Sequence, residues 1–226
     1  MTTGALGLDV SSWQHPDGKP IDWEAVRADG YTFVIVKATQ GADWVNPWLL
    51  RDLDDAFAAG FLTGAYHYFT AGVDPAAQGQ WFKQHLAGLH LDLHAWLDFE
   101  VAPQPPWTMA GWVNGFLEAC KPERPGVGLY CTASMWTELS AVNVAPPALW
   151  IASWGAAAPP VGATIWQTGQ AEVKGVPASC DVDRLLSTRG INLPSAPPAR
   201  PSSHQVQAVH PEPVDALEGE TASASE

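Results

Sequence analysis

The stretch Trp96-Leu97-Asp98-Phe99-Glu100 places two carboxylates two positions apart inside an apolar, aromatic-rich run. This composition is typical of a buried β-strand rather than of a solvated surface. Side chains on a strand alternate between its faces, so Asp98 and Glu100 are expected to share one face, opposite Leu97 and Phe99. The stretch therefore predicts a buried strand that presents both carboxylates to one site.

Two neighbouring carboxylates in a medium of low dielectric resist ionising together. The pKa of one is then expected to rise while the pKa of the other stays low. Such a pair can supply an acid and a base to a reaction. The alternative is a structural pair that bonds to the backbone or to an arginine, and the rest of the chain has to decide between the two.

Strand-like and helix-like segments alternate on both sides of this stretch. Strands are predicted over residues 5–10, 31–38, 61–69, 96–100 and 126–131, and then over 149–153, 164–167 and 182–186. The first five strands are followed by helices, four of them capped by Asp22, Asn46, Asp74 and Thr108 and the fifth over residues 134–139. The pattern is five strand–helix units and then three strands with little room for helices.

Strands that alternate with helices imply right-handed crossovers and a parallel sheet, and eight strands in one domain favour a closed barrel. The predicted fold is therefore α/β, an incomplete TIM-like barrel of five βα units followed by three strands. In such a barrel the chemistry lies at the C-terminal ends of the strands. The polar and aromatic residues near these ends are Asp9, Lys37, Tyr66, Tyr68, Asp98, Glu100, Tyr130, Trp166 and Gln167.

Several of these residues have a structural interpretation beside the functional one. Asp9 ends an apolar strand, where a carboxylate is costly to bury unless it is paired or used. Lys37 either contacts substrate or only neutralises a carboxylate of the site, and Trp166 belongs either to the core or to a cleft. His67 alternates away from the tyrosines on either side of it, so we expect it to pack rather than to contact a ligand.

Composition excludes several classes of function. The 24 acidic and 11 basic residues give a formal charge of −13, which argues against nucleic acid as a partner. The sequence contains no run of about 18 apolar residues, so no membrane span is expected. The 12 tryptophans offer flat apolar faces for the core and for the C–H faces of sugar rings.

No metal or other cofactor is expected. The three cysteines, Cys120, Cys131 and Cys180, are an odd number at no metal-ligand spacing. Three histidines at 85, 90 and 94 precede the acidic stretch, but their segment has no helical pattern that would collect them on one face.

Short motifs at the strand ends follow one another in a set order. They are Gly7 to Ser11, Phe33 to Thr39, Gly64 to Tyr68, Leu97 to Glu100, Leu149 to Ala152, Ile165 to Gln167 and Cys180 to Asp183. Together they resemble the family 25 glycoside hydrolases, the cell-wall muramidases often called Chalaropsis-type lysozymes and found in phages, bacteria and fungi. The resemblance covers residues 4 to about 190 and implies the same barrel that the strand count predicts.

The resemblance implies an enzyme that cuts peptidoglycan, the partner expected here, between N-acetylmuramic acid and N-acetylglucosamine with retention of configuration. Glu100 would be the general acid. Asp98 would either hold the acetamide N–H of the substrate, which the short spacing favours, or attack the sugar directly. Asp9 and Asp181 would support the site. The expected substrate-binding residues are Lys37, Tyr66, Tyr68, Tyr130, Trp166 and Gln167.

Two positions depart from the family pattern. Gln40 stands where the family usually has glutamate, which affects one contact at the rim. In the last motif the family has aspartate, an apolar residue and asparagine, and Asp183 stands at the asparagine position. The site role is therefore carried to Asp181.

Two other functions stay open. A chitinase-like N-acetylglucosaminidase also uses Asp-x-Glu on a barrel strand, but such enzymes carry further aspartates two and five positions upstream, where this chain has Trp96 and Leu93. A non-catalytic sugar-binding module on the same fold would have lost the acid, and Glu100 is present.

Residues 1–193 are expected to form the catalytic domain, and residues 194–226, rich in Pro, Ala, Ser and Glu, a disordered tail. The protein is expected to be a monomer. The first residues lack the basic and apolar regions of a secretory signal peptide. A phage enzyme made in the host cytoplasm and released through a membrane lesion, or a bacterial protein exported by another route, fits this start.

Overall fold

A computed structural model describes residues 3–121 and 126–188 of the chain. The strands are β1 (Leu6–Val10), β2 (Tyr31–Gln40), β3 (Trp44–Val45), β4 (Leu62–Tyr68), β5 (Ala95–Asp98), β6 (Val127–Thr132), β7 (Leu149–Ala152), β8 (Ile165–Ala171) and β9 (Cys180–Leu185). The helices are α1 (Trp23–Ala28), α2 (Leu49–Ala58), α3 (Pro75–Leu86), α4 (Pro106–Ala119) and α5 (Ala133–Ser140), with short 3₁₀ turns η1 (Ser12–Gln14) and η2 (Pro16–Gly18). The predicted tail, 194–226, lies outside the described residues.

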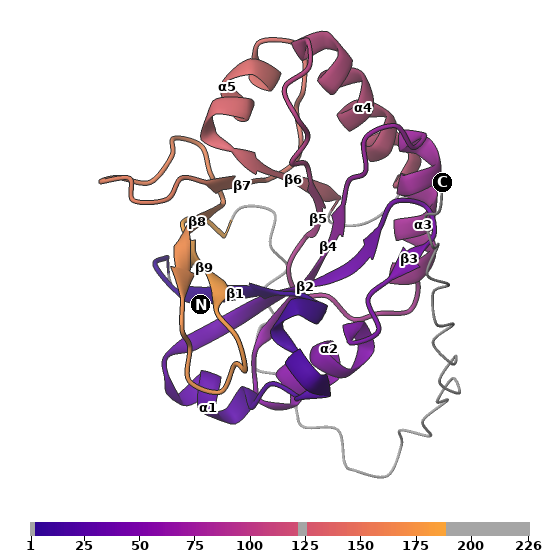
Figure 1. Cartoon of the computed structure of the whole chain (residues 1–226). Helices are drawn as coiled ribbons and strands as arrows, with labels where there is room; N and C mark the ends of the chain where they lie inside the picture. The colour runs from indigo at the N-terminus through magenta and orange to yellow at the C-terminus, as the bar shows by residue number, and fades with distance from the viewer. Residues whose placement is uncertain (1–2, 122–125, 189–226) are drawn as a thin grey trace, which may run out of the picture.

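The strands form one sheet in the order β1-β9-β8-β7-β6-β5-β4-β2-β3, and pairing of β1 with β2 closes it into a barrel (Figure 1). Neighbouring strands from β1 through β2, β4, β5, β6 and β7 to β8 are parallel. The predicted barrel of five βα units and three further strands is confirmed. The two-residue strand β3, which pairs with the end of β2, was not predicted.

The last strand runs against its neighbours. β9 pairs antiparallel with both β1 and β8. Its first residues therefore lie at the end of the barrel where the parallel strands finish. This reversal brings Asp181, opposite Asp9 in the β1–β9 register, to the C-terminal rim of the barrel.

Alternation along the strands separates the barrel interior from its outer layer. The interior cluster holds large side chains from alternate strand positions, among them Phe33, Ile35, Trp96, Trp150 and Ile165. A Cβ atom at Gly7 would lie 2.2 Å from the ring of Phe33, and one at Gly128 would lie 2.4 Å from the ring of Trp96. These two glycines leave the space that the interior aromatic rings fill.

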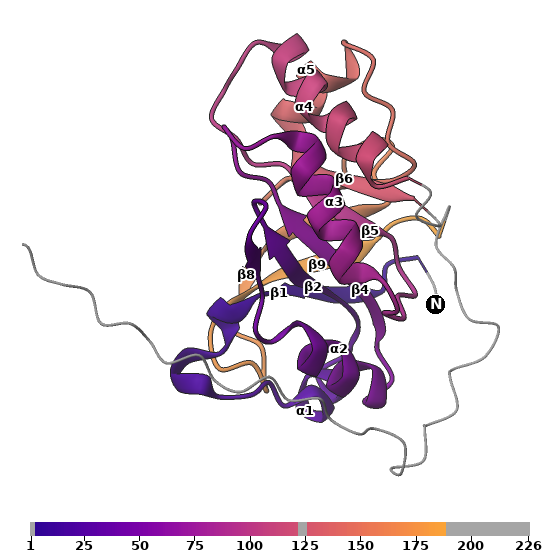
Figure 2. The ribbon, with the colours of Figure 1, turned by 90° about the vertical axis from the view of Figure 1, so that its right-hand side faces the viewer.

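The outward strand positions pack against the helices. Leu97 and Phe99 belong to this outer core, as the alternation of the acidic stretch predicts. Figure 2 shows α3, α4 and α5 stacked along one side of the sheet, with α1 and α2 below them. His67 also faces this layer, where its Nδ1 lies 2.8 Å from Thr39 Oγ1 and its ring 4.9 Å from that of Phe116. The expectation that His67 packs is confirmed.

Several predicted boundaries move. Asp22 and Asp74 cap their helices as predicted. Helix α4 begins at Pro106 instead of after Thr108, because a proline at the first helical position already has the required φ angle. Asn46 does not cap α2, since its side chain bonds to the backbone of Lys37 and Trp48 and holds the turn before the helix.

A buried pair ties the loop after β1 to α2. His15 Nε2 lies 2.9 Å from Asp52 Oδ2, His15 Nδ1 lies 2.9 Å from the carbonyl oxygen of Lys19, and the imidazole stacks on Trp48 with ring centroids 3.8 Å apart. Burial raises the pKa of Asp52 to about 6, against the opposing effect of His15. The pair anchors the loop that carries η1 and η2.

Replacing Asp52 with alanine is expected to destabilise the fold by about 1–3 kcal/mol, because it leaves one ring nitrogen of the buried His15 without its partner. Urea unfolding followed by fluorescence measures this loss. The matched control is Asp55→Ala in the same helix. Asp55 is exposed and, within the described residues, pairs with the exposed Arg51, so about 0–1 kcal/mol is expected there. Equal losses for the two variants would contradict the anchoring role.

Candidate active site

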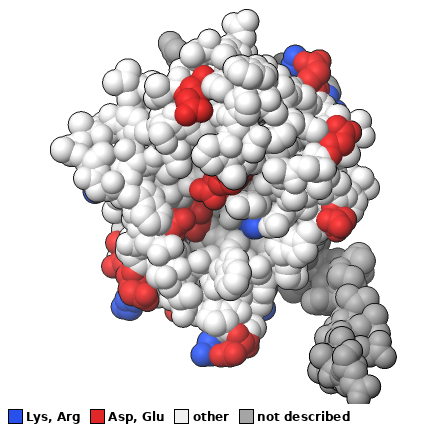
Figure 3. Space-filling view, turned by 45° about the horizontal axis from the view of Figure 1, so that its top comes forward, with Lys and Arg blue, Asp and Glu red and all other residues white. Residues whose placement is uncertain are grey.

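A cleft of about 260 Å³ opens at the C-terminal ends of the parallel strands. Figure 3 shows acidic side chains meeting in a hollow of the molecule, beside one basic side chain. Four carboxylates and one lysine line the cleft together with aromatic and amide side chains. The lining residues are Asp9, Val10, Ser11, Trp13, Gln14, Lys37, Tyr66, Tyr68, Asp98, Glu100, Tyr130, Trp150, Gln167, Gln170 and Asp181. Such a surface offers proton donors and flat faces to a polar, ring-shaped ligand.

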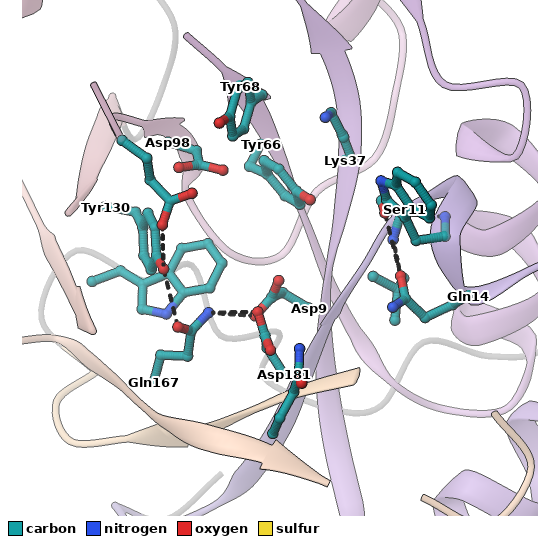
Figure 4. A pocket seen from close by; sticks show the side chains of 15 residues that line it. Asp9, Ser11, Gln14, Lys37, Tyr66, Tyr68, Asp98, Tyr130, Gln167 and Asp181 are labelled. Atoms are coloured by element: carbon teal, nitrogen blue, oxygen red, sulfur yellow. Dashed lines mark hydrogen bonds between the residues drawn. The ribbon is translucent and has the colours of Figure 1, made fainter. Parts of the chain in front are cut away.

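Asp98 ends β5 and faces the cleft beside Tyr66 and Tyr68 (Figure 4). The side chain is buried, and no donor among the described residues reaches its Oδ1. A buried acceptor without a donor is costly, so this oxygen is suited to accept a hydrogen bond from a bound ligand. Burial, and then the charges of Glu100 and Asp9, raise the pKa of Asp98 well above its usual value.

Glu100 lies two residues past Asp98, just beyond the end of β5, and its side chain is in contact with solvent. The hydroxyl of Tyr130 donates to its Oε1 over 3.1 Å. The surrounding protein raises the pKa of Glu100, the Tyr130 hydrogen bond opposes this, and the charge of Asp181 adds to it. The expectation that one member of the pair keeps a low pKa is wrong in this cleft, since burial raises the pKa of both.

The amide of Gln167 holds the floor of the cleft together. Its Nε2 donates to Asp9 Oδ2 over 2.9 Å and to Asp181 Oδ2 over 3.3 Å. Its Oε1 accepts from Trp154 Nε1 at 2.9 Å and lies 3.0 Å from Tyr130 Oη, whose single proton it shares with Glu100 Oε1. The first of these links is drawn in Figure 4. Carboxylate acceptors lie on one side of this amide, and the hydroxyl and indole donors lie on the other. Only one of the two orientations of the amide therefore satisfies all its partners.

The carboxylate of Asp9 is close to other acids. Burial raises its pKa well above the usual value, the charge of Asp181 raises it further, and the hydrogen bond from Gln167 opposes both effects. Mutual repulsion and burial in this cleft therefore oppose the ionisation of all its acids at once.

Comparison with known proteins connects this geometry to a family. The sequence model described as glycosyl hydrolases family 25 matches residues 8–176. The chain belongs to glycosyl hydrolase family 25. It is 31% identical to lysozyme M1 of Streptomyces globisporus, over 81% of this chain and 67% of that protein. It is 30% identical to the N,O-diacetylmuramidase of Chalaropsis sp, over 75% of this chain and 90% of that protein.

Solved structures agree with the sequence comparison. The bacterial lysozyme from Streptomyces coelicolor superposes with a TM-score of 0.71 at 30% identity, covering 83% of this chain and 94% of that one. The predicted family and barrel are thus confirmed. The protein is a glycoside hydrolase whose homologues are lysozymes and muramidases, and these support peptidoglycan hydrolysis as its activity.

One predicted site residue of this family 25 domain lies elsewhere. Trp166 does not line the cleft, and its Nε1 donates instead to the carbonyl oxygen of Ser153 over 2.9 Å. The reason is the alternation of β8, which points Gln167 inward and therefore turns Trp166 outward. Trp150 on β7 faces inward and borders the cleft, and it was not among the predicted site residues although it occupies an alternating strand position.

Lys37 and the loop after β1 complete the rim of the family 25 cleft. Lys37 Nζ donates to Gln40 Oε1 over 2.7 Å and lies 4.5 Å from the ring centre of Tyr68. Gln40, which stands where the family usually has glutamate, therefore still contacts Lys37 at the rim, but as a neutral partner. Burial lowers the pKa of Lys37, and Asp98 and Glu100 oppose this.

Residues of η1 also line the cleft, although none of them was among the predicted site residues. Gln14 accepts from the backbone N–H of Ser11 over 2.8 Å, which forms a capping box, and exposed Trp13 stands at the mouth of the cleft. A serine followed three residues later by glutamine was the available signal.

Among the described residues, no group of His, Cys, Asp and Glu has an arrangement that could hold a metal ion.

Proposed function

We propose that this protein is an N-acetylmuramidase that hydrolyses the β-1,4 bond between N-acetylmuramic acid and N-acetylglucosamine in peptidoglycan, with Glu100 as general acid and base. The observation that carries this proposal is the pairing, in one cleft, of a solvent-reaching Glu100 with the buried, donor-free Oδ1 of Asp98. The first can exchange protons with water and the second can hold a neutral part of the substrate.

Glu100 has the chemistry of the proton donor. Breaking a glycosidic bond needs a proton on the leaving oxygen as positive charge develops on the sugar. The raised pKa keeps Glu100 protonated over more of the pH range, and the Tyr130 hydroxyl holds its carboxyl in place. After the leaving group departs, the same carboxylate takes a proton from the attacking water.

Asp98 has the chemistry of an acetamide-orienting group. Its Oδ1 lacks a donor and would accept the N–H of the substrate acetamide. The acetamide oxygen, so oriented, attacks the anomeric carbon from the opposite side, and water then opens the cyclic intermediate with retention. Direct attack by a carboxylate is the alternative, and it also retains configuration.

The remaining lining groups support charge and bind sugar. The acidic floor formed by Asp9 and Asp181 stabilises the positive charge that develops in the transition state. The rings of Tyr66 and Tyr68 in the cleft and of exposed Trp13 at its mouth are suited to the C–H faces of the glycan rings. The acidic cleft and the formal charge of −13 are unsuited to binding nucleic acid. We propose that the protein is a monomer and that its partner is peptidoglycan. In the described part of the chain, no helix is long and apolar enough to cross a membrane.

Digestion of purified peptidoglycan is the test of this proposal. New reducing ends are expected on N-acetylmuramic acid, identified after borohydride reduction and mass spectrometry, with little cleavage of chitin oligosaccharides. Reducing ends on N-acetylglucosamine would favour the chitinase-like alternative. Binding to cell walls without any new reducing ends would favour a non-catalytic module.

A further inference from the structure

Asp183 is a buried acid directly beneath the floor of the cleft, and the mechanism above does not use it. It lies on β9 opposite Gly7 of β1 and Gln167 of β8, and its side chain is fully buried. Trp150 Nε1 donates to its Oδ1 over 2.8 Å. No donor among the described residues reaches its Oδ2. One oxygen is therefore satisfied, and the other lacks a donor in a buried place.

The surroundings of Asp183 do not support a negative charge. The groups that face it are the carboxylates of Asp9 on β1 and Asp181 on β9, and the neutral indole of Trp150 on β7. No lysine, arginine or histidine is among the described groups that act on it. A buried carboxylate without a cation takes up a proton instead of keeping its charge. Burial, and then the charge of Asp9, raise the pKa of Asp183 well above its usual value, and the hydrogen bond from Trp150 opposes this only in part.

We propose that Asp183 is a neutral positioning residue, whose protonated Oδ2 donates a hydrogen bond to the carboxylate of Asp9 and fixes that carboxylate beneath the substrate. The proton gives Oδ2 a partner in a site where no other donor reaches it. Negative charge is better placed on Asp9, which is partly exposed to the cleft and accepts from Gln167 Nε2 over 2.9 Å. Asp9 thus receives one donor from β8 and a second from β9.

Two substitutions separate this role from that of a charged residue. Asp183→Asn keeps the shape, an acceptor for Trp150 and a donor for Asp9 at every pH, so kcat on peptidoglycan should stay close to that of the wild type. Asp183→Leu removes both hydrogen bonds and should lower kcat by about 10²-fold, with little change in KM, because Asp9 loses its alignment.

Infrared difference spectra of Asp183→Asn against the wild type at neutral pH should show the loss of one carbonyl band of a protonated carboxylic acid. The melting temperature supplies a second readout. The unfolded chain releases the Asp183 proton above about its ordinary pKa of 3.8, whereas the folded chain keeps it, so wild-type stability falls as pH rises through this window. The asparagine variant has no such loss, and its melting temperature should rise relative to the wild type between about pH 4 and pH 7.

The catalytic part of this inference rests on the proposed function, whereas the infrared and melting measurements use no substrate and test the proton alone. No missing carbonyl band in Asp183→Asn would mean that Asp183 is ionised and would overturn the proposal. Loss of activity in Asp183→Asn, to the level of the leucine variant, would also overturn it, because the charge would then be needed. Wild-type kcat in Asp183→Leu would remove the positioning role. Should the leucine variant not fold, the asparagine variant alone decides.

Discussion

Glu100→Gln is expected to lower the turnover of peptidoglycan by about 10²–10⁴-fold while leaving the fold and the binding of cell walls intact. The glutamine side chain has nearly the same size and can still accept from the Tyr130 hydroxyl, which lies 3.1 Å from Oε1. It cannot give a proton to the glycosidic oxygen or take one from water. The loss should therefore fall on kcat, with the apparent affinity for the wall unchanged.

The measurement is the initial rate of reducing-end release, together with pelleting of the variant on purified walls. Glu24→Gln is the matched control, because the same chemical change then falls on an exposed first-turn residue of α1, outside the cleft lining. Near-normal hydrolysis by Glu100→Gln would remove Glu100 from the mechanism. A variant that neither cleaves nor binds walls would show that the side chain acts in binding instead.

Asp98→Asn is expected to lower kcat by about 10²–10³-fold, because the neutral amide no longer polarises the acetamide that attacks the sugar. The same substitution lowers activity but should keep or raise the stability of the fold. The folded protein holds the pKa of Asp98 well above the usual value, so ionised Asp98 opposes folding as pH rises above that usual value. The amide removes this opposition, and the melting temperature at neutral pH should stay equal or rise.

Two measurements distinguish the roles of Asp98. A lower melting temperature in Asp98→Asn would favour the structural interpretation of the Asp-x-Glu pair. Peptidoglycan from which the acetyl groups have been removed tests the chemistry. De-N-acetylation should slow the wild type strongly and Asp98→Asn much less, since the substrate group and the side chain act as one unit. Equal slowing of both enzymes would contradict the acetamide role and favour direct attack by a carboxylate.

Much of the architecture could be predicted because its signals are local. The number and order of strands follow from apolar runs separated by helix caps and glycines, and the parallel arrangement follows from the helices between them. Boundaries were less well predicted. Pro106 instead of Thr108 begins α4, and Asn46 holds a turn instead of capping α2, because these choices depend on the backbone that each residue meets.

The cleft residues likewise divide into those that a local pattern predicts and those that depend on neighbouring strands. Alternation placed Asp98 and Glu100 on one face, and both line the cleft. The same rule, applied to β8, puts only one of the neighbours Trp166 and Gln167 inside the barrel, and which of them is inside depends on register with the adjacent strands. The sequence alone could not decide this register, so Trp166 was placed in the cleft.

By itself the sequence determined that Asp98 and Glu100 face one site from an apolar strand of a βα unit, because alternation and helix capping involve only neighbouring residues. The structure ends this strand at Asp98, two residues before Glu100 and short of the predicted boundary. Tertiary structure decided what surrounds that pair. The antiparallel β9 brings Asp181 and Asp183 against Asp9, and the closed barrel buries Asp183 fully and Asp9 and Asp181 in part. Their raised pKa values follow from that burial and mutual repulsion, which arise only when strands far apart in the sequence meet.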